Sequence, residues 1–160
     1  MRMNTFQIID RDFLERVSLQ AKASPRRRRN HNFHASESDA CHRLLNAIEP
    51  DSYIQPHCHH DAAKDETLVA MRGRLGVILF DERGAVTATA VLAPAGESVG
   101  VNIPHGMYHT LVALEQGSVF FEAKSGPYAP LTSQEKAPWA PAEGEPRASS
   151  YLAELTRLFV

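Results

Sequence analysis

Three histidines stand within four positions of the chain, in the stretch PHCHHDAAKDETLVAMRG that begins at residue 56. His57 and His59 are two residues apart, so on a β-strand their side chains leave the same face. Glu66 follows, and His109 comes much later, after a turn marked by proline and glycine. Three imidazoles and one carboxylate suit one divalent ion of Zn, Mn, Fe, Ni or Co, with positions left open on an octahedral ion. The pattern predicts a metal site, on the condition that the fold brings His109 to the other three residues.

His60 and Cys58 are neighbours of the proposed ligands, and each could point toward the metal or away from it. A lone histidine in a strand is more often a hydrogen-bonded residue than a ligand. Alternation turns His60 away from His57, but a β-bulge would rotate the strand end and let His60 replace His59 as a ligand. Cys58 lies between two proposed ligands, so its side chain is expected to point away from the metal and to pack.

The run RRRRNHNFH, from Arg26 to His34, is a second group of residues able to bind a ligand. Guanidinium groups pair with carboxylate or phosphate in a bidentate geometry, and the interleaved amides and imidazoles can contact sugar hydroxyls. A charge run by itself is more often a solvated turn. We interpret this one as part of a site for a small anionic or sugar-like molecule. The candidate substrate-binding residues are Arg27, Arg29, Asn30, Asn32, His34, Tyr53 and Tyr128.

Two residues are candidates for moving a proton. Proton transfer near pH 7 requires a histidine, or a carboxylate whose pKa is raised by burial. His105 lies in the turn just before His109, and Glu122 lies on the next expected strand. Phenylalanines occupy both faces of that strand, so the pattern leaves open whether Glu122 faces inward.

Short strands rich in valine, isoleucine and phenylalanine must position these residues. Turns containing glycine, proline or aspartate separate them. The strands that we expect cover residues 52–59, 66–73, 74–81, 85–93, 98–104, 108–114 and 118–124. Several short strands with no helix between them favour an all-β antiparallel sandwich or barrel of the jelly-roll kind.

Helical segments flank the strands on both sides. Residues 10–24 have apolar side chains at helical spacing before Pro25, and a short helix is expected to start at Ser38 or Asp39. Five prolines follow Gly126, and Trp139 is expected to anchor this proline-rich arm before a C-terminal helix. The divisions that we expect are an N-terminal helical extension with the arginine run, a β-barrel, and an arm with a helix, at residues 1–50, 51–126 and 127–160.

The composition excludes several kinds of partner. A formal charge of -2 over 160 residues gives no global basic field for nucleic acid or a membrane surface. No apolar run approaches the roughly 20 residues that span a bilayer. The two cysteines form no disulfide framework, and charges interrupt the N-terminus before any signal-like apolar core. We therefore expect a cytoplasmic protein with one core, no nucleic-acid or membrane partner, and a homodimeric state.

The chain resembles the cupin superfamily in two motifs. The first motif places two histidines around one residue, then a glutamate, six residues and a glycine. The second motif has a proline, a glycine and a histidine at fixed spacing. The matching residues are His57, His59, Glu66 and Gly73 for the first and Pro104, Gly106 and His109 for the second. This resemblance implies a double-stranded β-helix with one divalent metal held by His57, His59, Glu66 and His109.

Two departures from the motifs accompany the match. The loop between His59 and Glu66 has six residues, which is longer than usual, and Ala113 stands where the second motif ends in asparagine. A hairpin loop absorbs extra residues at small entropic cost, and an even number of them leaves the facing of both strands unchanged. The metal assignment is therefore kept.

A finer resemblance covers most of residues 24–141. RRRRNHNFH, RLLNAIEPDSYIQPHCH, HTLVAL, FEAKSGPY and APWAP are similar to WbuC-type cupin-fold metalloproteins, which are often associated with surface-polysaccharide gene clusters. The resemblance implies a metal-binding jelly roll without a defined reaction. We expect a metal-dependent enzyme that performs isomerase-like or epimerase-like Lewis-acid chemistry on a small anionic carbohydrate. A non-catalytic, metal-dependent sugar-binding module and an Fe(II)-dependent dioxygenase are the open alternatives.

Overall fold

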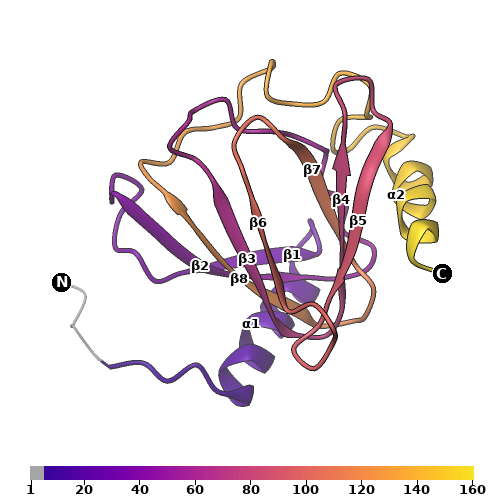
Figure 1. Cartoon of the computed structure of the whole chain (residues 1–160). Coiled ribbons are helices and arrows are strands. Elements are labelled where there is room, and N and C mark those ends of the chain that lie inside the picture. Colours follow the sequence, from indigo (N-terminus) through magenta and orange to yellow (C-terminus); the bar gives the residue numbers. More distant parts are fainter. Residues whose placement is uncertain (1–5) are drawn as a thin grey trace.

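Two antiparallel sheets face each other in the computed structural model, which describes residues 6–160 (Figure 1). The five-stranded sheet has the order β1-β2-β8-β3-β6, and the three-stranded sheet has the order β5-β4-β7. The strands are β1 Arg28–Asn32, β2 Cys41–Ile48, β3 Glu66–Arg72, β4 Leu75–Phe80, β5 Val86–Leu92, β6 Gly100–Ile103, β7 Tyr108–Ala113 and β8 Ser118–Ser125. The expected all-β jelly roll is confirmed. Residues 1–5, which begin the N-terminal segment that argued against export, lie outside the described residues.

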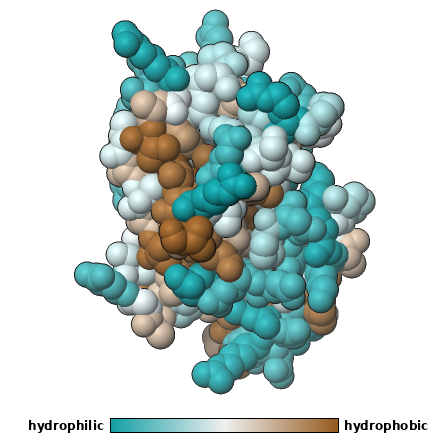
Figure 2. All heavy atoms as spheres, turned by 90° about the vertical axis from the view of Figure 1, so that its right-hand side faces the viewer, coloured by the Kyte–Doolittle hydropathy of each residue, from teal (hydrophilic) through white to brown (hydrophobic). Residues whose placement is uncertain are grey.

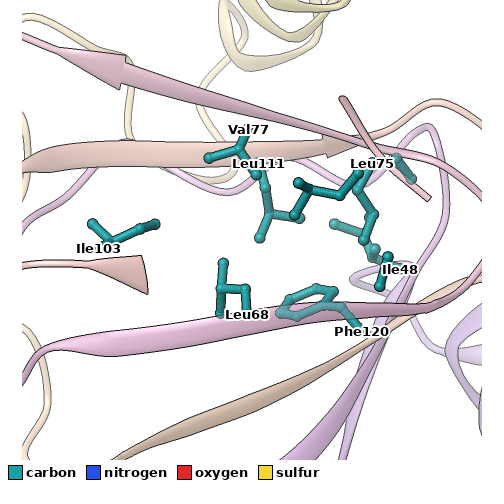
Figure 3. Close-up of a cluster of buried hydrophobic side chains, with 10 residues drawn as sticks. Ile48, Leu68, Leu75, Val77, Ile103, Leu111 and Phe120 are labelled. Atoms are coloured by element: carbon teal, nitrogen blue, oxygen red, sulfur yellow. The ribbon is translucent and has the colours of Figure 1, made fainter. Parts of the chain in front are cut away.

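The main core lies between the two sheets. Figure 3 shows Val77 and Leu111 of the small sheet opposite Leu68 and Phe120 of the large one. On β3, positions 66, 68 and 70 are all buried and face this interior. Leu68 and Ala70 therefore hold the strand in the core and fix Glu66 on the same inward face. The inside of the barrel is apolar at one end and polar at the other.

A second core lies on the outer face of the large sheet. Helix α1, Arg11–Ala23, begins after Asp10, whose side chain accepts a hydrogen bond from the N–H of Phe13. Phe13, Leu14, Val17 and Ala21 of α1 pack on Leu45, Ala47 and Val119 of the sheet. Val119 and Phe121 thus face α1, whereas Phe120 and Glu122 face the interior.

The segment expected to form a helix from Ser38 or Asp39 is strand β2, so that prediction is wrong. β2 pairs with β1 on one side and β8 on the other. Leu45 and Ala47 pack under α1, while Asn46 and Ile48 face the interior. Burial on both faces removes the alternation that marks a strand, and the remaining apolar cluster resembles a helical one. The large sheet thus takes its first two strands from before residue 51.

Residues 52–59, expected as a strand, contain only an isolated bridge at His57. Pro56 lacks the N–H that a ladder requires. His57 exchanges backbone hydrogen bonds with His109, at 3.0 and 2.8 Å, and residues 56 and 58 bond to the arm at 137 and 135. The segment is therefore fixed between β7 and the proline-rich arm.

The arm and the C-terminal helices cover the small sheet. Figure 1 shows the segment after β8 crossing one end of the barrel to reach α2, Ala148–Thr156, and the 3₁₀ helix η1, Arg157–Phe159. Trp139 of the arm packs against the rings of Phe80 and Tyr108, at centroid distances of 4.8 and 6.1 Å. Figure 2 shows this side of the molecule, where apolar atoms gather in a band between polar ones. No helix within residues 6–160 is both long and apolar enough to cross a lipid bilayer.

Candidate metal centre

Three residues place their ligand atoms together at the polar end of the barrel. Atoms from His57, Glu66 and His109 all lie within 4.8 Å of one another. β3 supplies Glu66 and β7 supplies His109, while the backbone bridge between residues 57 and 109 fixes His57 beside them. The His57 and His109 ring centroids are 4.6 Å apart, and His109 Nε2 is 3.1 Å from Glu66 Oε2. The fold thus brings His109 to Glu66 and His57, which precede it in the sequence by 43 and 52 positions.

The backbone orients both imidazole rings for ligation. His57 Nδ1 lies 3.0 Å from the carbonyl oxygen of Gln55, and His109 Nδ1 lies 2.9 Å from that of Met107. When Nδ1–H donates to a carbonyl, the lone pair is on Nε2, which is the usual arrangement around a histidine metal ligand. Two such rings and a buried carboxylate fit a borderline divalent ion.

His59 contacts this group through the carboxylate. Its Nε2 lies 2.9 Å from Glu66 Oε1, and its ring centroid is 5.4 Å from that of His57 and 6.2 Å from that of His109. The three-residue group with mutual distances below 4.8 Å does not include His59. His60 is exposed, and its backbone N–H donates to Glu135.

The electrostatics of the group set the charge of its carboxylate and of one of its imidazoles. Burial and the neighbouring His109 lower the pKa of His57 to about 3. Burial alone would raise the pKa of Glu66, but hydrogen bonds from His109 and His59 and the charge of Lys124 hold it well below its usual range. At neutral pH His57 is therefore neutral and Glu66 is charged.

The group faces a cavity of about 410 Å³, which we call the metal cavity. This volume suits a small-molecule ligand. Apolar side chains from the core form its floor, and charged or amide side chains form most of the remaining wall. Its polar lining residues are Arg26, Arg28, Arg29, Asn30, Asn46, His57, Glu66, His109, Thr110, Glu122 and Lys124.

Lys124 links two carboxylates inside the metal cavity. Its Nζ lies 3.0 Å from Glu66 Oε1 and 2.6 Å from Glu122 Oε1. Asn46 donates to the other oxygen of Glu122 at 2.7 Å. Burial would lower the pKa of Lys124, but Glu122 and Glu66 raise it above its usual value, so the ammonium stays charged. Glu122 therefore lies at the cavity wall between a cation and an amide.

Only part of the arginine run lines the metal cavity. Arg29 and Asn30 do, together with Arg26 and Arg28. Arg27 lies elsewhere: it has a φ of 56°, and its guanidinium pairs with Asp51 at 3.0 Å.

The remaining predicted site residues lie away from the metal cavity. His34 stacks on His42 at a centroid distance of 4.0 Å, and Asn32 pairs with Leu44 at the end of β1. The Tyr53 hydroxyl donates to the Pro141 carbonyl at 2.7 Å, and burial raises the pKa of Tyr53. His105 is exposed, and its Nδ1 lies 2.8 Å from Asp65 Oδ1. Tyr128 lines a second cavity, of about 450 Å³, beside the first.

One known family model matches the chain. Residues 9–92, more than half of it, match a family model described as "Domain of unknown function (DUF6016)". The chain belongs to this family. No curated protein matched it. The DUF6016 match contains His57 and Glu66 but ends before His109, Glu122 and Lys124, so the site is completed by residues beyond it.

Solved structures similar to this DUF6016 chain show its fold. KdgF from Halomonas sp. has 19% identity and a TM-score of 0.51, covering 67% of this chain and 85% of its own. The conserved protein SPY1581 from Streptococcus pyogenes has 12% identity and a TM-score of 0.54, covering 79% and 93%. Protein SO0799 from Shewanella oneidensis has 16% identity and a TM-score of 0.50, covering 62% and 68%. At these identities the likeness extends to the fold alone, and it agrees with the jelly roll expected from the strand pattern.

Sequence reasoning included Arg26 and Arg28 in the run expected to bind an anion without singling them out, and it missed Asn46 and Lys124 as lining residues of the metal cavity. Glu122 and Lys124 share a strand face, so the alternation of β8 could have paired them once its inward face was known. Asn46 carried no such signal, because its segment was expected to be a helix.

Proposed function

We propose that this DUF6016 protein is a WbuC-type cupin metalloenzyme that acts on a small anionic carbohydrate, of the kind found in surface-polysaccharide metabolism. The observation that carries the proposal is the group of His57, Glu66 and His109, with ligand atoms within 4.8 Å, facing a cavity that arginines also line. The reaction class is non-redox isomerisation or epimerisation.

His57, Glu66 and His109 would hold one divalent ion, and His59, the fourth expected ligand, bonds to Glu66 but lies outside the group with mutual distances below 4.8 Å. Such an ion supplies Lewis acidity, which polarises a substrate oxygen. Glu66 also contacts Lys124, so its two oxygens are shared between the histidines and an ammonium group. This sharing fixes the carboxylate in one orientation.

The charge of the metal cavity supports an anionic substrate. Its lining includes four cationic side chains, Arg26, Arg28, Arg29 and Lys124, against two carboxylates, Glu66 and Glu122. The whole chain, by contrast, has a formal charge of -2. Glu143 pairs with Arg26 and Arg28, which still leaves more cations than carboxylates, and a local excess of positive charge raises the local concentration of anions. Asn30 and Asn46 add amide groups that can bind sugar hydroxyls.

Glu122 is the proton carrier in this proposal. It lines the metal cavity, whereas His105, the other candidate, is exposed and paired with Asp65. Lys124 beside it stays positively charged and stabilises negative charge that develops on the substrate. Asn46 holds the second oxygen of Glu122 and so orients it toward the cavity.

The test has two steps. Elemental analysis of protein purified without chelator should show one divalent ion per chain. Anaerobic incubation with nucleotide sugars and sugar acids, followed by NMR of the products, should then show an isomerised or epimerised sugar. Turnover that requires oxygen, or that appears only with Fe(II), would overturn the proposal in favour of a dioxygenase. Tight sugar binding without turnover would favour a non-catalytic module.

We propose that the protein resides in the cytoplasm and forms a homodimer. Cys41 and Cys58 are both free thiols, which suits a reducing compartment. The apolar band in Figure 2 supports self-association, since exposed apolar patches often mark protein interfaces. Val86 and Val91 of β5 and Leu158 of η1 are among the exposed apolar residues. Light scattering at several protein concentrations tests the dimer.

A further inference from the structure

A second cavity adjoins the metal cavity on the side of the proline-rich arm. It has a volume of about 450 Å³, and we call it the arm cavity. Arg26, Arg28, Ile54 and His57 line both cavities, so the two form one continuous region beside the candidate metal ligands. The arm adds polar groups from Tyr128, Lys136 and Glu143.

The Glu143 carboxylate accepts hydrogen bonds from two arginines in the arm cavity. Arg26 binds it as a fork, with Nε and Nη2 each 2.7 Å from one carboxylate oxygen. Arg28 Nη2 reaches one of the same oxygens at 2.6 Å. These hydrogen bonds hold the pKa of Glu143 low, at about 2, so the carboxylate is charged at neutral pH. A bidentate guanidinium pair of this kind also binds free carboxylates and phosphates.

The backbone and Ser52 hold Arg28 in place independently of Glu143. Arg28 Nη1 donates to the Tyr53 carbonyl at 2.9 Å and to Ser52 Oγ at 3.2 Å. Ser52 in turn donates to the carbonyl of Arg26 at 2.7 Å. The Arg28 side chain is 15% exposed, so its charge is partly desolvated and requires a negative partner. The guanidinium is therefore already oriented to bind a carboxylate, whether that of Glu143 or that of a ligand.

The segment that carries Glu143 is open to solvent on one side. Gly144 follows it with a φ of 89°, and a Cβ built at Gly144 would meet no atom within 4 Å. The Glu143 side chain is 37% exposed. Exchange of its carboxylate therefore requires displacement of an exposed glycine-containing turn, and the barrel core is left intact.

We propose that Glu143 is a tethered stand-in for the anionic group of the ligand, and that a carboxylate or phosphate replaces it on Arg26 and Arg28. This deepens the proposed function and rests on it for the metal-bound end of the ligand. The substrate then has two parts: an oxygen-bearing end in the metal cavity and an anionic end in the arm cavity. Lys136 and Tyr128 line the arm cavity and are available to contact that anionic end.

The test is calorimetric titration of inorganic phosphate, and separately of D-glucuronate, into wild-type and Glu143→Gln protein at constant ionic strength. Removing a tethered competitor raises apparent affinity, because the ligand no longer competes at the high effective concentration of an intramolecular group. We expect affinity for at least one of the two anions to rise about tenfold. The anion that responds identifies phosphate or carboxylate as the recognised group.

Glu97→Gln is the matched control, since it removes the same charge from an exposed turn. It should change either affinity by less than about twofold. The gain in Glu143→Gln should disappear when Arg26→Ala is added. Equal affinities in Glu143→Gln and Glu97→Gln would overturn the inference. If Glu143→Gln fails to fold, Glu143→Asp carries the same test, with a smaller gain expected and the absence of any gain counting against the inference.

Metal content, measured on the same samples with and without added Mn²⁺, separates this inference from the proposed function. Protein that binds no metal but shows the gain would defeat the metalloenzyme and leave the anion site standing. Protein that binds metal and converts a sugar without the gain would defeat the anion site alone.

Discussion

At the scale of single residues, three histidines that look equivalent in the sequence pattern have different contacts in the candidate site. His57 and His109 have Nδ1 bonded to backbone carbonyls and belong to the compact group with Glu66. His59 bonds to the carboxylate of Glu66 and lies farther from the other two rings. Its effect on a bound metal should therefore be smaller than that of His57.

We predict that His57→Gln lowers affinity for Mn²⁺ or Zn²⁺ more than His59→Gln does. Loss of a group that orients a ligand typically costs about 10–100-fold in metal affinity, and loss of a ligand itself costs more. Competition with a chromophoric chelator measures both affinities. His60→Gln is the control and should have no effect. Equal losses at positions 57 and 59 would show that both histidines are ligands of the same rank.

The role of Glu122 gives a second prediction at this scale. Glu122→Gln keeps the shape of the side chain but cannot carry the proton, so kcat should fall about 10²–10⁴-fold on the identified substrate. Metal content should stay at the wild-type level, since Glu122 bonds to Asn46 and Lys124 and to none of the three grouped ligands. Unchanged kcat would remove Glu122 from the mechanism.

At the scale of elements, the strands flanked by clear turns were predictable, whereas β1 and β2, which precede those turns, were not. Strands β3 to β8 alternate with glycine-containing or proline-containing turns, and the sequence indicated each of them. The cupin motif spacing also indicated His57, Glu66 and His109 before their proximity was known. Lys124 and Asn46 depend on the order β2-β8-β3 in the sheet, which no local pattern specifies, because distant pairing decides it.

The packing of α1 on β2 gives a prediction at the scale of elements. Leu45 is fully buried under α1, so Leu45→Ala should lower the free energy of unfolding by about 2–5 kcal/mol. Leu19 lies on α1 and is 53% exposed, so Leu19→Ala should cost less than about 0.5 kcal/mol. Urea unfolding followed by circular dichroism measures both. Similar losses would mean that α1 docks through another face.

At the scale of the whole molecule, the arm is tied to the barrel by charge as well as by apolar packing. Trp139 packs on Phe80 at one point, and Glu143 bridges to Arg26 and Arg28 at another. The second tie depends on an ionised carboxylate, so its contribution to stability depends on pH.

The pKa of Glu143 falls from 4.5 to about 2 on folding, mainly through its hydrogen bonds with Arg26. A carboxylate with a lowered folded-state pKa contributes stability that is present above its unfolded pKa and lost as pH falls through its folded pKa. In metal-free protein, the stability advantage of wild type over Glu143→Gln should therefore shrink between about pH 5 and pH 2. Paired thermal melts across that range measure it. A constant difference in melting temperature would mean that the ion pair does not stabilise the fold.

The bridge at His57 has a consequence for how long a bound ion stays in place. On one side, His57 exchanges backbone hydrogen bonds with His109 of β7. On the other side, the Cys58 amide donates to the carbonyl of Glu135 in the arm, and the Ala137 amide of the arm donates to the carbonyl of Pro56, each at 2.9 Å. Opening of the arm frees the backbone that holds His57, so the residence time of the ion should follow local unfolding of the arm. The Cys58 and Ala137 amides should then exchange their hydrogens at a common rate. The opening rate of an arm with little helix or strand would in this way set the dissociation rate of the metal ion.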